Sequence, residues 1–213
     1  WEPPDIKNLL SQLPFELTFS QKKSLLEILR DLQKSLPMNR LLEGDVGSGK
    51  TIVAVLAAFI AAQNNCQTAF MAPTEVLARQ HFRTISGLLN RQQDGFEAGV
   101  ALLCAAEAKV NFGEELEINI TKTKLLNLIA KNQVKIIIGT HALIQEKVKF
   151  NNLALVIIDE QHRFGVEQRA KLLVRHSMSN IPHLLSMTAT PIPRTLALTI
   201  YGDLDLSSIT QLP

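Results

Sequence analysis

The octapeptide GDVGSGKT, Gly44 to Thr51, constrains the fold of this 213-residue chain more than any other stretch. Its spacing is Gly-x-x-x-x-Gly-Lys-Thr, with the apolar segment 39–45 before it and the helix-forming segment 50–63 after it. Glycines let the backbone take positive φ, so the N–H groups of such a loop can point toward an anion at a helix start. The sequence therefore predicts a phosphate-binding loop between a strand and a helix. The competing interpretation is a chance match in a glycine-containing turn.

In a loop of this kind the lysine and the hydroxyl residue have separate tasks. Lys50 can reach the outer phosphates of a nucleoside triphosphate, and the Thr51 hydroxyl can bind Mg²⁺. We therefore expect a nucleoside triphosphate and Mg²⁺ to bind at this loop. The loop residues predicted to bind the nucleotide are Gly44, Asp45, Val46, Gly47, Ser48, Gly49, Lys50 and Thr51.

Short apolar runs alternate with longer helical patterns along the chain. The predicted strands are 39–45, 68–73, 99–104, 134–140, 153–160 and 183–190, and the predicted helices between them are 50–63, 74–92 and 121–133. Nearly continuous hydrophobic strands that alternate with helices indicate a parallel sheet covered on both faces. The fold class is therefore α/β, doubly wound, with a mostly parallel sheet and with ligands expected at the carboxyl ends of the strands.

Two adjacent acids, Asp159 and Glu160, follow the apolar run 153–158. Downstream of a phosphate loop, the first acid is placed to hold the Mg²⁺ that Thr51 also contacts. The second can polarise the water that attacks the terminal phosphate, so Lys50, Asp159 and Glu160 are the predicted catalytic residues. A solvated strand end that is capped by acids is the alternative.

Composition sets looser limits. The net charge of +2 does not by itself indicate nucleic acid, a membrane or an acidic partner. Cys66 and Cys104 match no metal-ligand spacing and suit buried thiols in a reducing compartment, so we expect a cytoplasmic protein. No apolar run reaches the roughly 20 residues of a membrane span.

Three segments define the expected domain organisation. Residues 1–12 look like a linker or an N-terminal extension, with a peripheral helix expected at 18–33, and residues 13–213 form the nucleotide-binding domain. Residues 105–123 have no clear period and are expected to be a surface insertion. The chain begins on Trp1 without a methionine and ends on TQLP, so we expect it to be a piece of a larger protein.

Five motifs occur in the order seen in superfamily 2 helicases and translocases: GDVGSGKT, APTEVLARQH, IIGTHAL, IIDEQH and TATPIPRT. The longer stretches LPFELTFSQ, VIIDEQHRFGVEQR and MTATPIPRTLALTIYGDLDLSSITQLP resemble the first motor domain of the RecG family of branched-DNA helicases. The resemblance covers residues 13–213. It implies a RecA-like P-loop NTPase domain that binds Mg²⁺-ATP and couples hydrolysis to the remodelling of forks and junctions in DNA repair and recombination.

The resemblance also implies roles for single residues. Gln21 matches a glutamine that reads adenine, although Thr18 and Gln21 also have the spacing of a capping box, and the two roles are compatible. Thr74, Thr140 and His141 match positions that contact the backbone of a nucleic-acid strand. For Thr74, a plain helix N-cap is the alternative.

Four further residues match positions that couple the nucleotide site to a second motor domain. They are Gln161, His162, Thr188 and Thr190. One departure from the family concerns the Cys104–Ala106 stretch, which lacks the usual Thr and Gly and precedes an acidic segment. We therefore assign no DNA contact there.

The family implies partners that this segment does not contain. These are a second RecA-like domain, which supplies an arginine finger, and an N-terminal wedge domain that reads DNA branches. We expect the fragment alone to bind ATP but to hydrolyse it poorly. The alternatives are the motor of an Mfd-like double-stranded DNA translocase and a regulatory or phosphotransfer P-loop module. The motif THALIQ and the glutamine in DEQH favour RecG over Mfd.

Overall fold

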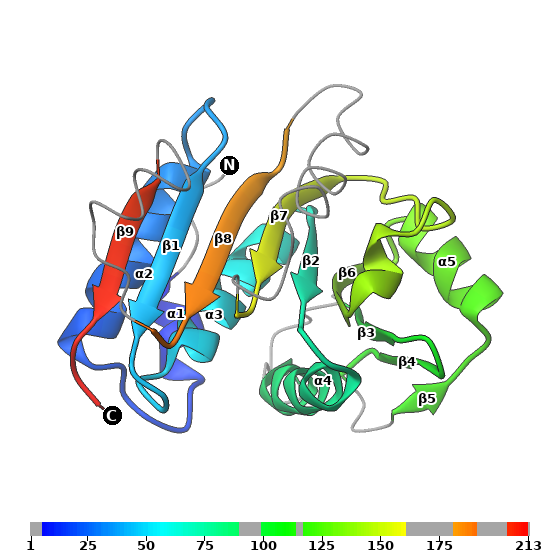
Figure 1. The fold of residues 1–213 in the computed structure, drawn as a ribbon, viewed down its shortest axis with the longest axis horizontal. Coiled ribbons are helices and arrows are strands. Elements are labelled where there is room, and N and C mark those ends of the chain that lie inside the picture. The colour runs from blue at the N-terminus through cyan, green and yellow to red at the C-terminus, as the bar shows by residue number, and fades with distance from the viewer. Residues whose placement is uncertain (1–5, 90–98, 114–116, 161–180, 191–203, 213) are drawn as a thin grey trace.

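The computed structural model describes residues 6–89, 99–113, 117–160, 181–190 and 204–212 (Figure 1). The strands are β1 (Asn39–Gly44), β2 (Gln67–Met71), β3 (Gly99–Leu103), β4 (Ala108–Asn111), β5 (Ile118–Asn119), β6 (Val134–Gly139), β7 (Leu153–Ile158), β8 (His183–Thr188) and β9 (Asp205–Ile209). The helices are α1 (Ile6–Ser11), α2 (Phe19–Leu32), α3 (Lys50–Gln63), α4 (Glu75–Leu89), α5 (Lys122–Ala130) and the short 3₁₀-helix η1 (His141–Ile144).

All of these strands join one sheet in the order β5-β4-β3-β6-β2-β7-β8-β1-β9. The strands from β3 to β9 in that order pair in parallel, and only β4 and β5 pair antiparallel with their neighbours. The doubly wound, mostly parallel fold predicted from the sequence is confirmed. The six predicted strands are β1, β2, β3, β6, β7 and β8, each within two residues of its expected bounds.

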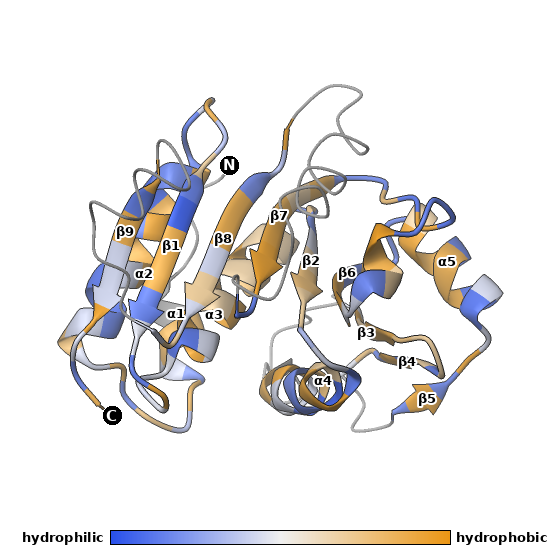
Figure 2. Cartoon of the chain, in the orientation of Figure 1, coloured by the Kyte–Doolittle hydropathy of each residue, from blue (hydrophilic) through white to orange (hydrophobic). Residues whose placement is uncertain are grey.

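The sheet has a hydrophobic cluster on each face, because neighbouring residues of a strand point to opposite sides. Leu155 and Ile157 of β7 pack in the cluster with α1, α2, α3 and α4. Val156 and Ile158 of the same strand pack in the other cluster, with α5 and η1. Figure 2 shows the result as an almost uniformly hydrophobic β7 at the centre of the sheet.

Two segments of the expected domain organisation contain regular structure that the sequence did not indicate. The expected linker 1–12 contains the helix α1, and its Leu9 is buried in the main cluster. The expected surface insertion 105–123 contributes β4 and β5 to the edge of the sheet. Ala108 and Val110 are buried while Lys109 between them is half-exposed, a two-residue period too short to be recognised in the sequence.

The strand β9 was also not predicted, because two serines interrupt its apolar pattern. Those serines are bonded to side chains of neighbouring elements. Ser207 accepts from Arg40 at 2.8 Å and donates to Glu27 at 2.5 Å, and Ser208 donates to Glu43 at 2.6 Å. Arg40 is in turn paired with the buried Asp31 at 2.6 Å, so polar contacts fasten β9 and α2 to β1.

Among the described helices, none combines the length and the apolar character that a membrane crossing requires.

Gln67, the first residue of β2, joins three other segments of the chain through its side chain. Its side chain is fully buried, and its Nε2 donates to the carbonyl oxygens of Ile129 (2.8 Å) and Val134 (2.9 Å). Its Oε1 accepts from the backbone N–H groups of Asn151 (2.8 Å) and Asn152 (3.1 Å). One side chain therefore satisfies four backbone groups, at the end of α5, at the start of β6 and just before β7.

Replacement of Gln67 by leucine should destabilise the protein strongly, because buried backbone groups lose their partners. Each unpaired buried group costs about 1–3 kcal/mol, so we expect the free energy of unfolding to fall by about 3 kcal/mol. Urea denaturation measures this change. The matched control is Gln63→Leu at the exposed end of α3, which should stay within about 0.5 kcal/mol. Equal effects of the two variants would contradict the role of Gln67.

His183 gives the fold a pH dependence. Its Nδ1 accepts the backbone N–H of Met38 at 3.0 Å, which requires an unprotonated Nδ1. Burial lowers the pKa of His183, and the charge of Asp31 only partly opposes this. In the unfolded chain a histidine takes up a proton near pH 6.5. Between that pH and the lower folded pKa, the unfolded state binds more protons, so stability falls as the pH falls.

We expect the free energy of unfolding to decrease below about pH 6.5, with His183 contributing up to about 1.4 kcal/mol per pH unit. Urea denaturation at pH 7.5 and 5.5 measures the slope. His183→Gln keeps an acceptor but does not titrate, so its slope should be shallower. A slope unchanged from that of the parent protein would show that His183 is not responsible.

Candidate nucleotide-binding site

The loop between β1 and α3 has the conformation that its glycines predict. Gly47 and Gly49 have φ values of +83° and +86°, in the left-handed region that favours glycine. A Cβ on Gly47 would meet open space, whereas a Cβ on Gly49 would lie 2.3 Å from Nε2 of Gln21. The loop therefore turns sharply into the first turn of α3, where helix N–H groups are available to an anion.

Lys50 lies against its own loop. Its ammonium donates to the carbonyl oxygens of Gly44 (2.6 Å) and Asp45 (2.9 Å). Burial lowers the pKa of Lys50, while the negative charges of Glu160 and Asp159 act in the opposite direction. The charges of both predicted acids therefore act on Lys50, although the acids are more than a hundred residues away in the sequence.

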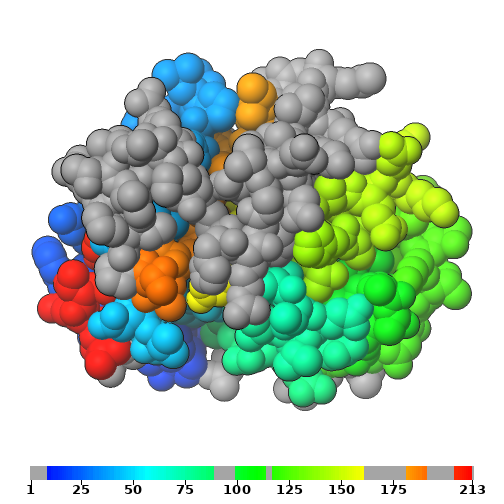
Figure 3. All heavy atoms as spheres, in the orientation of Figure 1, coloured from blue at the N-terminus to red at the C-terminus, as the bar shows by residue number. Residues whose placement is uncertain are grey.

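The sheet explains how these residues meet. The strands β1, β8 and β7 are adjacent and parallel, so their carboxyl ends lie at one edge. Thr188 ends β8 and lies between Gly44 at the end of β1 and Asp159 just beyond β7. In Figure 3 the cyan atoms around the loop lie at the surface between the red atoms of the β9 segment and the orange atoms of β8.

The two acids differ in their surroundings. Asp159 is largely buried, and its Oδ2 is 2.8 Å from Nε2 of His81 on α4. Its backbone N–H donates to the carbonyl of Met71 at 2.9 Å, which continues the pairing of β7 with β2. Glu160 has a φ of +52°, uncommon for a residue with a side chain, and such strain is frequent at functional sites.

Gln21 makes the capping box that was one of its two predicted roles, and it also contacts the phosphate loop. The capping box is confirmed: the side chain of Thr18 accepts from the Gln21 N–H, and Gln21 Oε1 accepts from the Thr18 N–H at 2.9 Å. Its Nε2 donates to the carbonyl of Ser48 in the loop at 2.8 Å. The amide is 2% exposed and connects the start of α2 to the phosphate loop.

A mainly apolar pocket of about 500 Å³ opens beside Gln21. It is lined by residues before α2, on the first turns of α3 and on α4: Pro14, Phe15, Gln21, Gly49, Thr51, Ile52, Val55, Arg83, Thr84, Gly87 and Leu88. The pocket adjoins the loop on the side of Thr51, so its position suits the flat, partly apolar base of a nucleotide whose phosphates lie in the loop.

The predicted nucleic-acid contacts lie at the same edge of the sheet. Thr74 is exposed and caps α4, with its Oγ1 accepting the N–H of Leu77 at 3.3 Å, so the N-cap interpretation describes its hydroxyl. Thr140 and the exposed His141 follow β6 and start η1. No side-chain cap bond is made by Thr140.

The turn after β3 is tied to α4. Glu75 accepts the N–H of Ala105 at 2.9 Å and pairs with Arg79 at 3.1 Å, and Arg79 also contacts Glu107. The hydrogen bond from Arg79 is the main cause that lowers the pKa of Glu107. A carboxylate therefore already occupies the Ala105 N–H in the Cys104–Ala106 stretch, where we assigned no DNA contact.

The residues at this edge fit a nucleotide with a divalent cation. The hydroxyl of Ser48 is buried in the loop and has no hydrogen-bond partner among the described residues. The ammonium of Lys50 has three N–H donors and uses two of them on carbonyls of the loop. The available cation ligands are oxygens, from Thr51 and Asp159, which suits Mg²⁺. Within the described ranges, no group of three or more His, Cys, Asp or Glu side chains is placed to hold a metal ion.

Two of the predicted coupling residues can be located. Thr188 is buried, and its hydroxyl is 3.0 Å from the hydroxyl of the exposed Thr190. Gln161 and His162 lie outside the described residues. His81 was not among the predicted site residues, although it ends the motif APTEVLARQH. The signal was its position two helical turns after Thr74, on the buried face of α4.

Comparison with known proteins gives a consistent result. The family model described as DEAD/DEAH box helicase matches residues 18–199. The chain is 50% identical over 201 residues to the ATP-dependent DNA helicase RecG of Synechocystis, and 47% identical over 208 residues to that of Aquifex aeolicus. These matches cover 94% and 98% of the chain but only 22% and 24% of the relatives, so the chain spans about a quarter of their length.

A solved structure of RecG bound to a three-way DNA junction is similar with a TM-score of 0.76 and 42% identity. The match covers 98% of this chain and 26% of that one.

The two left-handed glycines allow a matched test of the loop. Gly47→Ala should lower the free energy of unfolding by about 1–2 kcal/mol through backbone strain alone. Gly49→Ala should cost about 1 kcal/mol more, because its Cβ displaces the Gln21 amide from Ser48. In a Gln21→Ala background the additional cost should disappear. Urea denaturation of the four variants measures this, and an additional cost that persists without Gln21 would contradict the contact.

Proposed function

The chain belongs to the DEAD/DEAH box helicase family, and from this premise we propose that it is the first motor domain of an ATP-dependent DNA helicase that remodels branched DNA. Its substrates in this proposal are replication forks and recombination junctions, and its role is in DNA repair and recombination. Action on DNA in the cytoplasm is part of the same proposal.

One observation carries the proposal. The phosphate loop and the pair Asp159 and Glu160 lie at one edge of the sheet, in a chain that is 47–50% identical to RecG helicases over nearly all of its length. The Mfd-like translocase is not favoured, because the relatives described above are RecG helicases. A phosphotransfer module is not supported by any described contact.

In the proposed reaction, the loop N–H groups and Lys50 bind the phosphates of ATP. Thr51 and Asp159 would hold Mg²⁺, which neutralises charge on the phosphate oxygens when it is bound. Glu160 orients and polarises the attacking water, and Lys50 stabilises the negative charge that develops on the terminal phosphate. The charges of Asp159 and Glu160 both act on the ammonium of Lys50, which supports a site that all three residues share.

The base of ATP would occupy the pocket beside Gln21. A glutamine amide can both donate to and accept from adenine. The hydrogen bond from Gln21 Nε2 to the carbonyl of Ser48 already holds this amide next to the phosphate loop. Thr74, Thr140 and His141 would contact the phosphate backbone of a DNA strand with hydroxyl, imidazole and helix-start N–H groups. All three follow strands whose carboxyl ends lie at the edge that carries the phosphate loop.

The relatives are about four times as long as this chain, and we propose that the missing parts of the reaction come from that additional length. A second RecA-like domain would supply an arginine to the terminal phosphate, and a wedge domain would recognise the DNA branch. Gln161, His162, Thr188 and Thr190 would pass the nucleotide state to the second domain. Residues 1–213 alone should bind ATP but hydrolyse it poorly.

The proposal predicts distinct effects of two substitutions in the full-length protein. Glu160→Gln should keep ATP binding and lower DNA-dependent hydrolysis by about 10²- to 10⁴-fold, because the water loses its base. Lys50→Ala should weaken ATP binding as well. Binding is measured with a fluorescent ATP analogue and hydrolysis by phosphate release, with forked and linear DNA compared. Phosphate transfer to a small molecule, or hydrolysis that ignores DNA, would refute the helicase assignment.

A further inference from the structure

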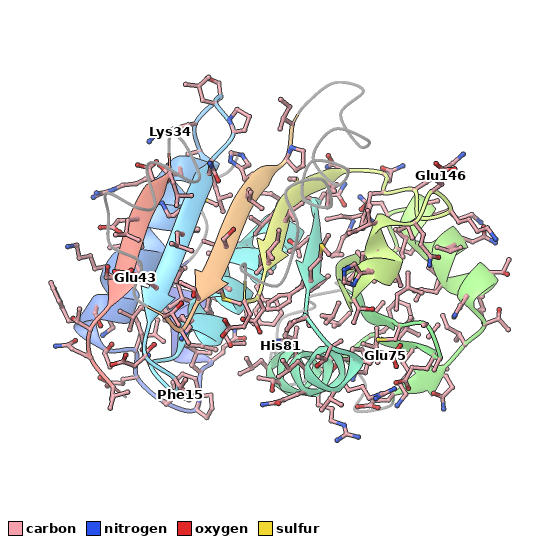
Figure 4. All side chains as sticks on the ribbon, in the orientation of Figure 1. Phe15, Lys34, Glu43, Glu75, His81 and Glu146 are labelled. Carbon is pink, nitrogen blue, oxygen red and sulfur yellow. The ribbon has the colours of Figure 1, made fainter. Side chains whose placement is uncertain are left out.

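The proposed metal ligand Asp159 is held by a residue from a different part of the fold. His81 lies on α4, between that helix and the ends of the central strands (Figure 4). Its Nε2 is 2.8 Å from Oδ2 of Asp159, and the two side chains are only 8% and 14% exposed. This contact joins residues 78 positions apart.

The chemistry of the pair assigns a direction to the hydrogen bond. An ionised aspartate can only accept hydrogen bonds, so Nε2 of His81 carries the hydrogen and donates a hydrogen bond to Oδ2. The imidazole is fixed on its other side by packing, with its ring centroid 4.7 Å from that of Phe70 on β2. The donor that contacts Asp159 is therefore rigid, and it restricts the rotation of the carboxylate.

A carboxylate that binds a metal ion depends on such a partner. The hydrogen bond keeps one oxygen of the carboxylate in place and leaves the other oxygen for a cation. Loss of an outer partner of this kind typically lowers metal affinity or activity about 10- to 100-fold. Asp159 follows the last residue of β7 directly, so its backbone is fixed by the sheet and its side chain is the part that needs a restraint.

We propose that His81 is a positioning residue that orients Asp159 for the divalent cation of bound ATP. This inference rests on the proposed function, because it takes Mg²⁺-ATP as the ligand. In this proposal α4 positions a metal ligand through His81, in addition to carrying Thr74 at its start. His81 itself does not contact the nucleotide in this proposal.

A purely structural role for His81 makes a different prediction. If only its packing on Phe70 mattered, a phenylalanine at position 81 would replace it without effect on the cation. If the donated hydrogen bond matters, glutamine would replace it better, because the amide Nε2 of glutamine extends about as far as the imidazole Nε2. His81→Phe and His81→Gln therefore separate the two roles.

The test titrates Mg²⁺ into the intact protein with a fluorescent ATP analogue and records the concentration at which half of the cation-dependent binding is reached. His81→Phe should raise this concentration about 10- to 100-fold, and His81→Gln should stay within about threefold of the parent protein. Binding in the presence of EDTA should be the same for all three proteins, since it does not involve Asp159.

The matched control is Ser86→Ala. Ser86 is a buried polar residue on the same helix whose hydroxyl has no hydrogen-bond partner in the described part of the chain, so its removal should leave the Mg²⁺ dependence unchanged. A double-mutant cycle with Asp159→Ala guards against indirect effects. In that background His81→Phe should no longer change the Mg²⁺ dependence, because the carboxylate it acts on is gone.

The inference is overturned if His81→Phe has the Mg²⁺ dependence of the parent protein, or if its effect persists without Asp159. Failure of the proposed function looks different, because the parent protein itself would then show no Mg²⁺-dependent binding of the ATP analogue. Circular dichroism confirms that each variant is folded at the temperature of the titration. If His81→Phe does not fold, His81→Leu, which also lacks the donor, is titrated in its place, and the same rise in the Mg²⁺ concentration is expected.

Discussion

The site depends on the parallel alignment of β1, β8 and β7. Their apolar residues are buried on both faces of the sheet, so a shift of one strand by a single residue would move its side chains into the wrong cluster. This fixes the level at which each strand ends. The phosphate loop, Thr188 and the pair of acids are consequently held at one edge, although their sequence positions span about 140 residues.

Side-chain contacts then refine what the strands place approximately. Gln21 fastens the start of α2 to the loop through Ser48, and His81 fastens α4 to Asp159. Lys50 is occupied by carbonyl oxygens of its own loop, and these bonds are weaker than those that an ammonium makes with phosphate. At this edge of the sheet, the phosphate loop and Lys50 can therefore bind a negatively charged group.

Much of the fold followed from local patterns. The six predicted strands, α3 and the capping box of α2 have strong periodic or turn signals, because each signal lies within a short window of the sequence. The strand β9 and the edge strands β4 and β5 gave no such signal. The serines of β9 are satisfied by Arg40, Glu27 and Glu43, partners 165 or more positions away, and no window of sequence contains them.

The sequence alone determined the phosphate loop, the acid pair and the alternation of strands and helices, since these depend on residue type and short spacing. Only the tertiary structure placed β8 between β1 and β7 and brought His81 to Asp159. It also decided that the Ala105 N–H is occupied by Glu75. The physical reason is that strand order and helix packing minimise exposed apolar surface over the whole chain, and the polar contacts form between whichever groups this packing brings together.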